Sequence, residues 1–410
     1  MPTLKPLPTQ ITLCRLVAQG LVPATAAQEV TSAVGSLLAL QGQQVSAVPH
    51  ALLARTPSAT VRDVRAAFDE IALVRSWPMR GTVHITTAQD HHWLRAALLH
   101  RYDTYRHDAA ENHGIDAKTL GVAAATVLEE IDREGPITRA RAVELWAEAG
   151  LMDPARTVSA GASIEEAWQE TSRRRRLVML LHLEGILVQA PAGVNEHLLV
   201  DARDLPDETC GAVPGEKVGR GESGHEAALA EIARRFALGH GPVQVADLAR
   251  WLMIPAGECS RALEAAVESS ARTDTPVARM RLDEGGARLV PWETPISARE
   301  RNAHAFYMRA DLPELVEASR RRALGTVYLG MFDEMHVGYK DRSCLTDTVG
   351  ENLICPAKNG MFRPFVVDRG RLVAVQRGSD LLWHPKAQLS ARLEADVRRA
   401  VDRMTRRLSA

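Results

Sequence analysis

One pattern occurs twice in this chain and restricts the folds that it can adopt. GPITRARAVELWAEAG begins at Gly135 and GPVQVADLARWLMIPAG begins at Gly241, and each places Gly-Pro and a β-branched residue before a helix with apolar residues at matching positions. An apolar helix precedes each copy, over 120–131 and 227–238, and another helix and two short strands follow each copy. We therefore predict a small unit of helices closed by a β-hairpin, present at least twice.

The amino-terminal part of the chain has the same order of elements. Ser58 is a suitable cap for a helix over 60–70, and two strands, 72–77 and 81–86, are predicted to pair across a turn at 78–80. Helices followed by a two-stranded wing are typical of a winged-helix unit. We therefore expect three such units in tandem.

The segment after Pro291 has a different pattern. Helices are predicted over 305–322 and 391–408, and strand-like runs lie between them at 326–339, 352–357, 361–369 and 371–377. The predicted fold class is mainly α with small β-hairpins (α+β), in which three tandem winged-helix units precede a C-terminal β-rich domain. The predicted boundaries are 1–115, 116–202 and 225–292 for the three units, 203–224 for a linker, and 293–410 for the last domain.

Composition indicates a soluble globular protein. The chain has 410 residues, of which 46% are hydrophobic and 25% charged, and no apolar run reaches the ~18 residues needed to span a bilayer. The amino terminus lacks a basic segment followed by an apolar one, and the five cysteines form no CxxC, so we expect a cytoplasmic protein without zinc or disulfides. The formal net charge of −1 neither indicates nor excludes nucleic-acid binding, which depends on local patches.

Common catalytic motifs are absent, and the most distinctive polar cluster consists of glutamines. GxSxG, Walker A and HExxH do not occur, whereas Gln41, Gly42 and Gln43 stand at the end of a helix predicted over 26–40. Glutamine is a neutral donor and acceptor, so two such amides would position a water without deprotonating it. This suffices only for a leaving group that is already good, such as an N7- or N3-alkylated purine. The alternative is that both are ordinary polar residues at a helix end.

Several cations are candidates for contacts with DNA. Arg75, Arg80 and His84 lie on or near the first hairpin, and Arg173 and Arg174 belong to an SRRRRL run in the helix predicted over 164–184. Arginines can contact phosphates on either side of a helix, but four in succession can equally serve only to solvate it.

An adjacent pair of carboxylates, Asp333-Glu334, lies in the strand predicted over 326–339. Neighbouring residues of a strand point to opposite faces, so we do not expect a catalytic dyad. Structural ion pairs are the favoured interpretation of these two residues.

Six segments, taken together, resemble the AlkZ/YcaQ-like winged-helix DNA glycosylase family. They occur in the family's order and cover most of the chain. The segments are LVAQGL (16–21), LLALQGQQ (37–44), VRSWPMRGTVHI (74–85), GPVQVADLARW (241–251), MFDEMHVGYKDR (331–342) and FRPFVVDRGRLVAV (362–375).

The resemblance implies a fold that is C-shaped around a DNA-binding concavity. It also implies a monofunctional DNA glycosylase, without lyase activity, that hydrolyses the N-glycosidic bond of bulky N7-alkylguanine in double-stranded DNA. Some family members unhook interstrand crosslinks, and some give self-resistance to DNA-alkylating natural products. The family uses no metal and no Schiff base, so we expect no cofactor, and we expect a monomer.

The family's catalytic signature is Gln, an aliphatic residue, then Gln or Asp, and it falls here on Gln41, Gly42 and Gln43. Glycine at the centre departs from that pattern, removes an apolar contact that would seat the motif, and makes room for a larger adduct. Gln44 beside the motif is a candidate DNA contact. A turn at Lys358-Asn359-Gly360 is a candidate for probing the minor groove.

Two other functions fit the predicted architecture. Tandem winged helices alone would suit a non-catalytic DNA-binding protein such as a transcriptional regulator, although no coiled coil for dimerisation is evident. A winged-helix scaffold that binds protein is the other alternative, and the net charge near zero favours it.

Overall fold

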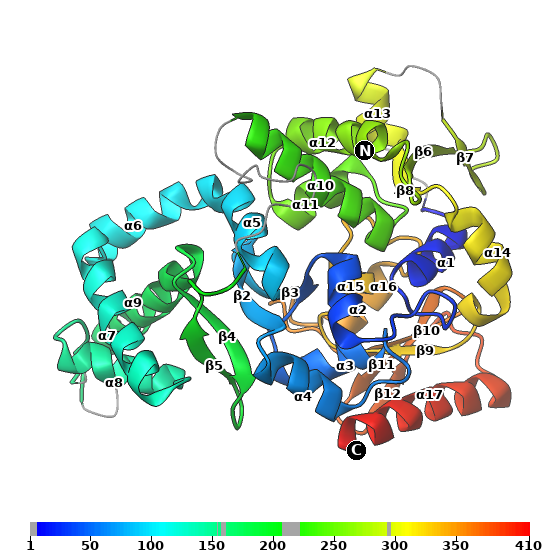
Figure 1. Ribbon diagram of the computed structural model, residues 1–410. Helices are drawn as coiled ribbons and strands as arrows, with labels where there is room; N and C mark the ends of the chain where they lie inside the picture. The colour runs from blue at the N-terminus through cyan, green and yellow to red at the C-terminus, as the bar shows by residue number, and fades with distance from the viewer. Residues whose placement is uncertain (1–5, 154, 157–160, 207–221, 293–296) are drawn as a thin grey trace. The chain divides into compact units, whose positions relative to one another are not determined.

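The computed structural model describes residues 6–153, 155–156, 161–206, 222–292 and 297–410 (Figure 1). The chain divides into two compact units. Met1–Ala66 and Gly221–Ala410 form one, which we call the terminal unit, and Ala67–Arg220 form the other, the central unit. Most of the predicted linker 203–224 lies outside the described residues. No helix among the described residues is long and apolar enough to cross a bilayer.

The terminal unit begins with helices whose apolar faces are buried. They are α1 (Thr9–Ala18), α2 (Val30–Leu37), α3 (Val48–Leu53) and α4 (Val61–Asp69), the last of which contains the boundary between the units. Leu13, Leu16 and Val17 of α1 belong to a core that also contains Phe365 and Leu372, far along the chain. Thr60 rather than Ser58 exchanges capping hydrogen bonds with Asp63 at the start of α4.

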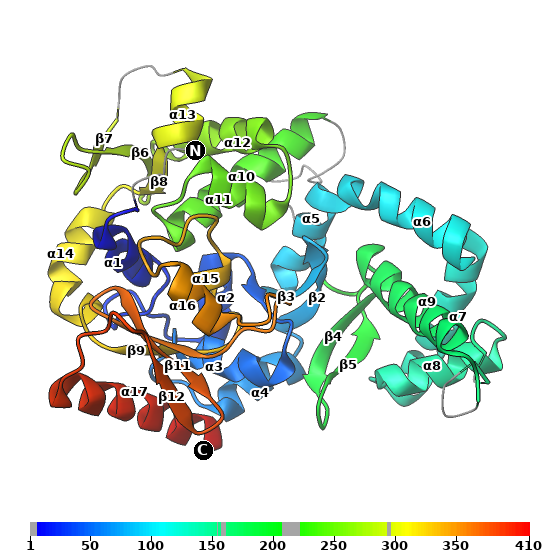
Figure 2. The same cartoon turned by 180° about the vertical axis from the view of Figure 1, so that it is seen from behind.

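The order of elements predicted around the second copy of the repeat, which begins at Gly241, is confirmed. The order is α10 (Glu222–His240), α11 (Val245–Leu252), α12 (Ala256–Ser270), β6 (Val277–Leu282), β7 (Leu289–Pro291), α13 (Ala298–His304), β8 (Phe306–Arg309) and α14 (Leu312–Ala323). The helix predicted over 305–322 was wrong at its start, because β8 pairs antiparallel with β6 there and buries Phe306, Tyr307 and Met308. α1 lies against α14 (Figure 2).

An antiparallel sheet in the order β12-β11-β10-β9 ends the terminal unit. The four strands are β9 (Val327–Leu329), β10 (Phe365–Asp368), β11 (Arg371–Arg377) and β12 (Asp380–Trp383). The helices of this part of the chain are α15 (Glu334–Val337), α16 (Thr348–Ile354) and α17 (Ala391–Ser409). Two strand predictions were wrong. Residues 326–339 contain the short β9 and then α15, and 352–357 overlap α16, whose first turn is capped by the Asp347 side chain.

The central unit contains the first hairpin and the first copy of the repeat. Its elements are β2 (Leu73–Met79), β3 (Thr82–Thr87), α5 (Ala88–Leu98), α6 (Asp103–His113), α7 (Ala117–Glu134), α8 (Arg139–Glu148), α9 (Ile164–Leu183), β4 (Leu187–Ala192) and β5 (His197–Asp201). Strands β3, β2, β4 and β5 pair antiparallel in that order. Pro78 lies inside β2, so the hairpin turn is Arg80-Gly81, where both φ angles are positive, and not 78–80.

The predicted fold class is confirmed: the chain is α+β, mainly helical, with small antiparallel sheets. The grouping into three winged-helix units and the C-shaped arrangement of those units stay predictions.

Candidate functional site

The glutamine motif follows a sharp turn in the backbone. α2 ends at Leu37, and Leu38 has φ 65° and ψ −48°, with the Ala39 N–H donating to the Leu37 carbonyl at 2.8 Å. This geometry is a γ-turn, a strained conformation that a branched residue adopts only where its surroundings impose it. Leu38 is fully buried, so its packing supplies that constraint.

The turn places the motif outside any helix. Gln41 ends the two-residue strand β1 (Leu40–Gln41), and Gln44 precedes a short 3₁₀ turn at Val45–Ala47. We predicted that the motif stands at the end of a helix over 26–40. This was wrong, because α2 ends at Leu37 and the motif follows outside it. On a helix Gln41 and Gln43 would have faced different directions, and this objection to a joint role does not apply to the observed backbone.

Burial differs along the motif. Gln41 is half-buried and Gly42 is buried, whereas Gln43 and Gln44 are exposed. The Gln44 side-chain amide donates to the Ser46 hydroxyl at 3.2 Å. Gln43 is therefore at the surface of the protein, and Gln41 lies deeper.

A buried carboxylate holds the backbone of Gln41. The Gln41 N–H donates to Glu334 Oε1 at 2.9 Å, and Glu334 is fully buried at the start of α15. Its other oxygen, Oε2, accepts from Trp251 Nε1 at 3.3 Å and lies 3.4 Å from His240 Nε2. The carboxylate thus fixes the peptide of one motif glutamine from inside the protein.

The neighbouring carboxylate, Asp333, forms the ion pair expected from the sequence. It caps α15, and both of its oxygens accept from the Arg55 guanidinium, at 2.9 and 3.0 Å. Burial alone would lower the pKa of Arg55, but the attraction of Asp333 outweighs it and the pKa is raised. Asp333 and Glu334 stand at a helix start and not in the predicted strand, and both are engaged by protein donors, so we assign them no metal.

Glu334, Asp333 and Arg55 belong to a group of buried polar residues, which we call the polar layer. The polar layer continues from Arg55 through Gln19 to Tyr339. Arg55 Nη2 donates to Gln19 Oε1 at 2.6 Å, and Gln19 Nε2 donates to the Tyr339 hydroxyl at 2.8 Å. That hydroxyl in turn donates to the His240 carbonyl at 2.7 Å. All four residues are buried, and burial raises the pKa of the Tyr339 phenol well above its usual value.

Arg15 closes the layer on its far side. Its guanidinium lies 3.6 Å from the centre of the Tyr339 ring and 3.4 Å from Asp247 Oδ2. The sequence offered a weak signal of this layer, since Arg15 and Gln19 are polar residues inside an otherwise apolar helical stripe. Asp247 and Tyr339 lie more than 200 residues away and Arg55 lies 36 residues from Gln19, so no local pattern identified these partners.

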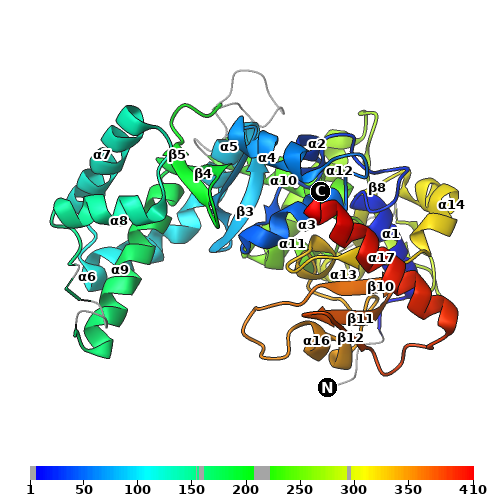
Figure 3. The same ribbon diagram turned by 90° about the horizontal axis from the view of Figure 1, so that it is seen from below.

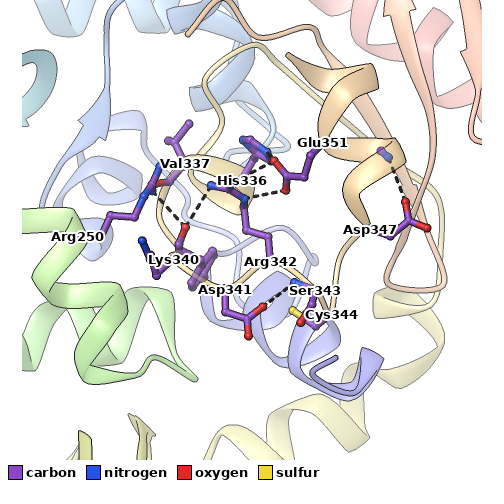
Figure 4. Close-up of polar contacts among 12 residues, drawn as sticks. Arg250, His336, Val337, Lys340, Asp341, Arg342, Ser343, Cys344, Asp347 and Glu351 are labelled. Carbon is purple, nitrogen blue, oxygen red and sulfur yellow. Dashed lines mark hydrogen bonds and ion pairs between the residues drawn. The ribbon is translucent and has the colours of Figure 1, made fainter. Parts of the chain in front are cut away.

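Further contacts fix α15 and the segment that follows it (Figure 4). Arg250 donates to the carbonyls of Val337 and Tyr339, at 2.7 and 3.2 Å. Glu351 of α16 accepts from Arg342 at 2.8 Å and lies 3.0 Å from His336 Nε2. Burial would raise the pKa of Glu351, but His336 and Arg342 together lower it to about 2. Glu334 is therefore presented by a segment that is fastened to α11 and α16.

Two predicted DNA contacts lie in the interior of the protein. The Arg75 guanidinium donates to the Gln189 side chain, and burial lowers its pKa to about 10. His84 is fully buried, with Nδ1 2.8 Å from the Thr82 carbonyl. A direct contact with a DNA backbone requires a side chain at the surface, so we do not retain that role for either residue. Arg80, in the hairpin turn, is half-buried.

The remaining predicted contacts differ in their environment. Arg173 donates to the Leu151 carbonyl at 2.9 Å and to the His113 carbonyl, so it has a structural role in holding α9. Arg174, Lys358 and Asn359 are exposed.

The turn predicted at 358–360 joins α16 to β10 and is not the turn of a hairpin. Within it, the Asn359 side-chain oxygen accepts from the Met361 N–H at 3.1 Å.

Comparisons with known proteins agree on one group. A family model described as DNA glycosylase AlkZ-like matches residues 34–407, a range that contains the glutamine motif and Glu334. Among solved structures, the Streptomyces sahachiroi DNA glycosylase AlkZ is similar with a TM-score of 0.65 and 17% identity, over 99% of this chain and 98% of that chain. At this identity the likeness to the solved structure shows the fold alone. No curated protein matches the chain.

Proposed function

Because this chain belongs to the AlkZ-like family of DNA glycosylases, we propose that it hydrolyses the N-glycosidic bond of bulky N7-alkylguanine in double-stranded DNA. Gln41 and Gln43 are the proposed catalytic residues. The reaction is monofunctional: water is the nucleophile, the base leaves, and the DNA strand stays intact. The observation that carries this proposal is the hydrogen bond between the Gln41 peptide and the buried carboxylate of Glu334.

The chemistry suits neutral side chains. N7-alkylation makes guanine cationic, so the glycosidic bond is already weakened and the departing base is neutral. The two amides orient the attacking water and place their oxygen dipoles toward the sugar as it gains oxocarbenium character. The departing guanine takes the electron pair of the glycosidic bond, and the water releases its proton to solvent as the new C–O bond forms, so a strong base is not required.

Glu334 supplies the negative charge that the motif lacks. A fixed carboxylate one hydrogen bond behind Gln41 orients that peptide and also lowers the energy of positive charge on the sugar, since charges interact strongly through a protein interior. In this proposal Glu334 is a positioning residue, because it acts through Gln41 and does not touch the substrate.

We expect Glu334→Gln to reduce the single-turnover rate of base release at least ~10-fold with little change in affinity for the damaged duplex, because it keeps the side chain's size and removes its charge. Glu334→Asp is the matched control, since it retains the charge and should recover part of the rate. Thermal unfolding and DNA affinity would be measured in parallel. A wild-type rate in Glu334→Gln would show that its charge has no part in the reaction.

The test of the function itself is base release from duplex DNA containing a single N7-alkylguanine. We expect a bulky N7 adduct to be released and the DNA strand to break only after alkali, because no lyase step follows. N7-methylguanine in the same sequence would show whether bulk is required. Absence of release from both duplexes, with DNA binding retained, would contradict the proposal and favour a non-catalytic DNA-binding protein.

We extend the proposal to interstrand crosslinks joined through N7 of guanine, and to self-resistance against a genotoxic natural product. The feature that motivates this extension is Gly42 at the motif centre, where the family's pattern has an aliphatic residue. The proposed DNA contacts are Gln44, Arg80, Arg174, Lys358 and Asn359, and the proposed active form is a monomer. Unhooking would appear as separation of the two strands of a crosslinked duplex under denaturing conditions.

A further inference from the structure

A groove with a volume of about 1360 Å³ runs across the terminal unit. Its walls are α17, the carboxyl end of α14, strand β9 and the segments around β11 and β12. α17 packs against β9 and α3, and Figure 3 shows α17 next to α3. None of the glutamines of the motif lines this groove, so it is distinct from the proposed catalytic site.

The groove is strongly cationic. Nine arginine or lysine side chains line it, against Asp368 and Asp396 in the lining and Asp347, which pairs with the lining Lys386 at 2.7 Å. The excess is six positive charges, in a chain whose formal net charge is −1. Arginine remains charged at any physiological pH. A concave surface lined by one sign of charge also focuses its electrostatic potential. The groove is therefore suited to an anionic ligand.

Part of this arrangement of charges opposes the stability of α17. Arg399, Arg403 and Arg407 follow one another at i,i+4 on α17, a spacing at which like charges destabilise a helix. Burial, and then the nearby Arg403, lower the pKa of Arg407. Asp396 compensates Arg399. Arg403 is repelled by both Arg399 and Arg407 and has no compensating ion pair among the described residues.

Three of the cations have no structural task in the part of the chain that the structure describes. Arg407 donates to the carbonyls of Leu53 and Thr56 and so fastens α17 to α3. Arg321, Arg322 and Arg403 show no comparable hydrogen bond or ion pair among the described side chains. Unpaired guanidinium groups gathered in one groove are available to a ligand.

We propose that this groove binds the phosphate backbone of nucleic acid. Arginine matches phosphate geometry with two parallel hydrogen bonds, and the α17 arginines extend from Arg392 to Arg407, about 22 Å at the helical rise of 1.5 Å per residue. A row of that length fits successive phosphates of one strand and exceeds the needs of a single anion. The inference rests on DNA as the substrate of the proposed function, but it does not depend on the glutamine chemistry.

The test compares two double variants on undamaged duplex DNA, with affinity measured by fluorescence anisotropy over a range of salt concentrations. Arg322→Gln/Arg403→Gln removes two groove cations, and Arg398→Gln/Arg406→Gln removes two exposed cations, also on α17, that do not line the groove. We expect the groove variant alone to lower the slope of log affinity against log salt by ~2, since each phosphate contact contributes ~0.9.

Three results would overturn this assignment. Equal slopes for both variants would mean that total charge and not the groove determines binding. An unchanged slope in the groove variant would exclude the groove as a contact. Displacement of DNA by polyglutamate at equal charge concentration would identify a general polyanion site. The groove is judged by the salt dependence of binding to undamaged duplex DNA, and the glutamine chemistry is judged by base release from the Gln41→Ala/Gln43→Ala variant, so a failure of the glutamine chemistry and a failure of the groove proposal give different results.

Discussion

Replacing both motif glutamines, Gln41→Ala with Gln43→Ala, should reduce release of a bulky N7-alkylguanine at least ~10³-fold, because each pre-positioned dipole near a developing charge is worth ~10²–10³ and the two act on one water. Affinity for the damaged duplex should change little, since the amides act on the sugar and the water and not on the phosphates. The measurement is the single-turnover rate of base release, with binding measured separately by anisotropy.

Gln44→Ala is the matched control for that experiment. Gln44 is the same residue type, is exposed, and is adjacent to Gln43. We expect Gln44→Ala to weaken DNA binding at most slightly and to leave the single-turnover rate unchanged. A double variant that kept more than a tenth of the wild-type rate would remove the glutamines from the mechanism. Equal losses in the Gln44 control would point to general disruption of the segment.

Local patterns in the sequence predicted those elements whose stability is local. The helix predicted over 164–184 is found as α9, the strand predicted over 371–377 is β11, and the charged helix predicted over 391–408 is α17. Each has a clear apolar periodicity or a recognisable cap and turn, and such signals depend on neighbours a few residues away.

Elements that depend on distant partners were predicted poorly. Phe306–Arg309 reads as the start of a helix, but it forms β8 because β6 provides a strand edge about thirty residues earlier in the chain. Residues 352–357 contain β-prone apolar residues, yet the Asp347 cap starts a helix that extends into them as far as Ile354. Tertiary context overrides local propensity at such positions.

The residues of the candidate site were chosen from the sequence and stay a prediction, whereas their geometry comes from the structure. Gln41 and Gln43 could be selected from the sequence, but a helix end was predicted where the structure has a γ-turn at Leu38 and a short strand. The link from Gln41 to Glu334 spans 293 positions, and no periodicity reports a contact of that range. The sequence showed Asp333-Glu334 as an adjacent pair of carboxylates, but only the fold shows that Glu334 contacts the motif.

Removing the charge of Asp333 should destabilise the terminal unit severely. Asp333 and Arg55 are both at most 1% exposed, so Asp333→Asn leaves a guanidinium buried without its counter-charge. Breaking a buried pair in this way costs ~3–5 kcal/mol of the free energy of unfolding. The measurement is the shift of the urea unfolding midpoint, followed by tryptophan fluorescence, because Trp251 lies in the same polar layer.

A surface ion pair provides the control, and a double variant separates charge burial from packing. Glu317→Gln removes the exposed partner of Arg320 and should cost less than ~1 kcal/mol. Asp333→Asn combined with Arg55→Met should recover part of the stability, because the double variant no longer buries an uncompensated charge. If Asp333→Asn lowered the free energy of unfolding no more than Glu317→Gln, the Asp333–Arg55 ion pair would not stabilise the terminal unit. The argument that Glu334 is held rigidly next to the Gln41 peptide would then lose its structural basis.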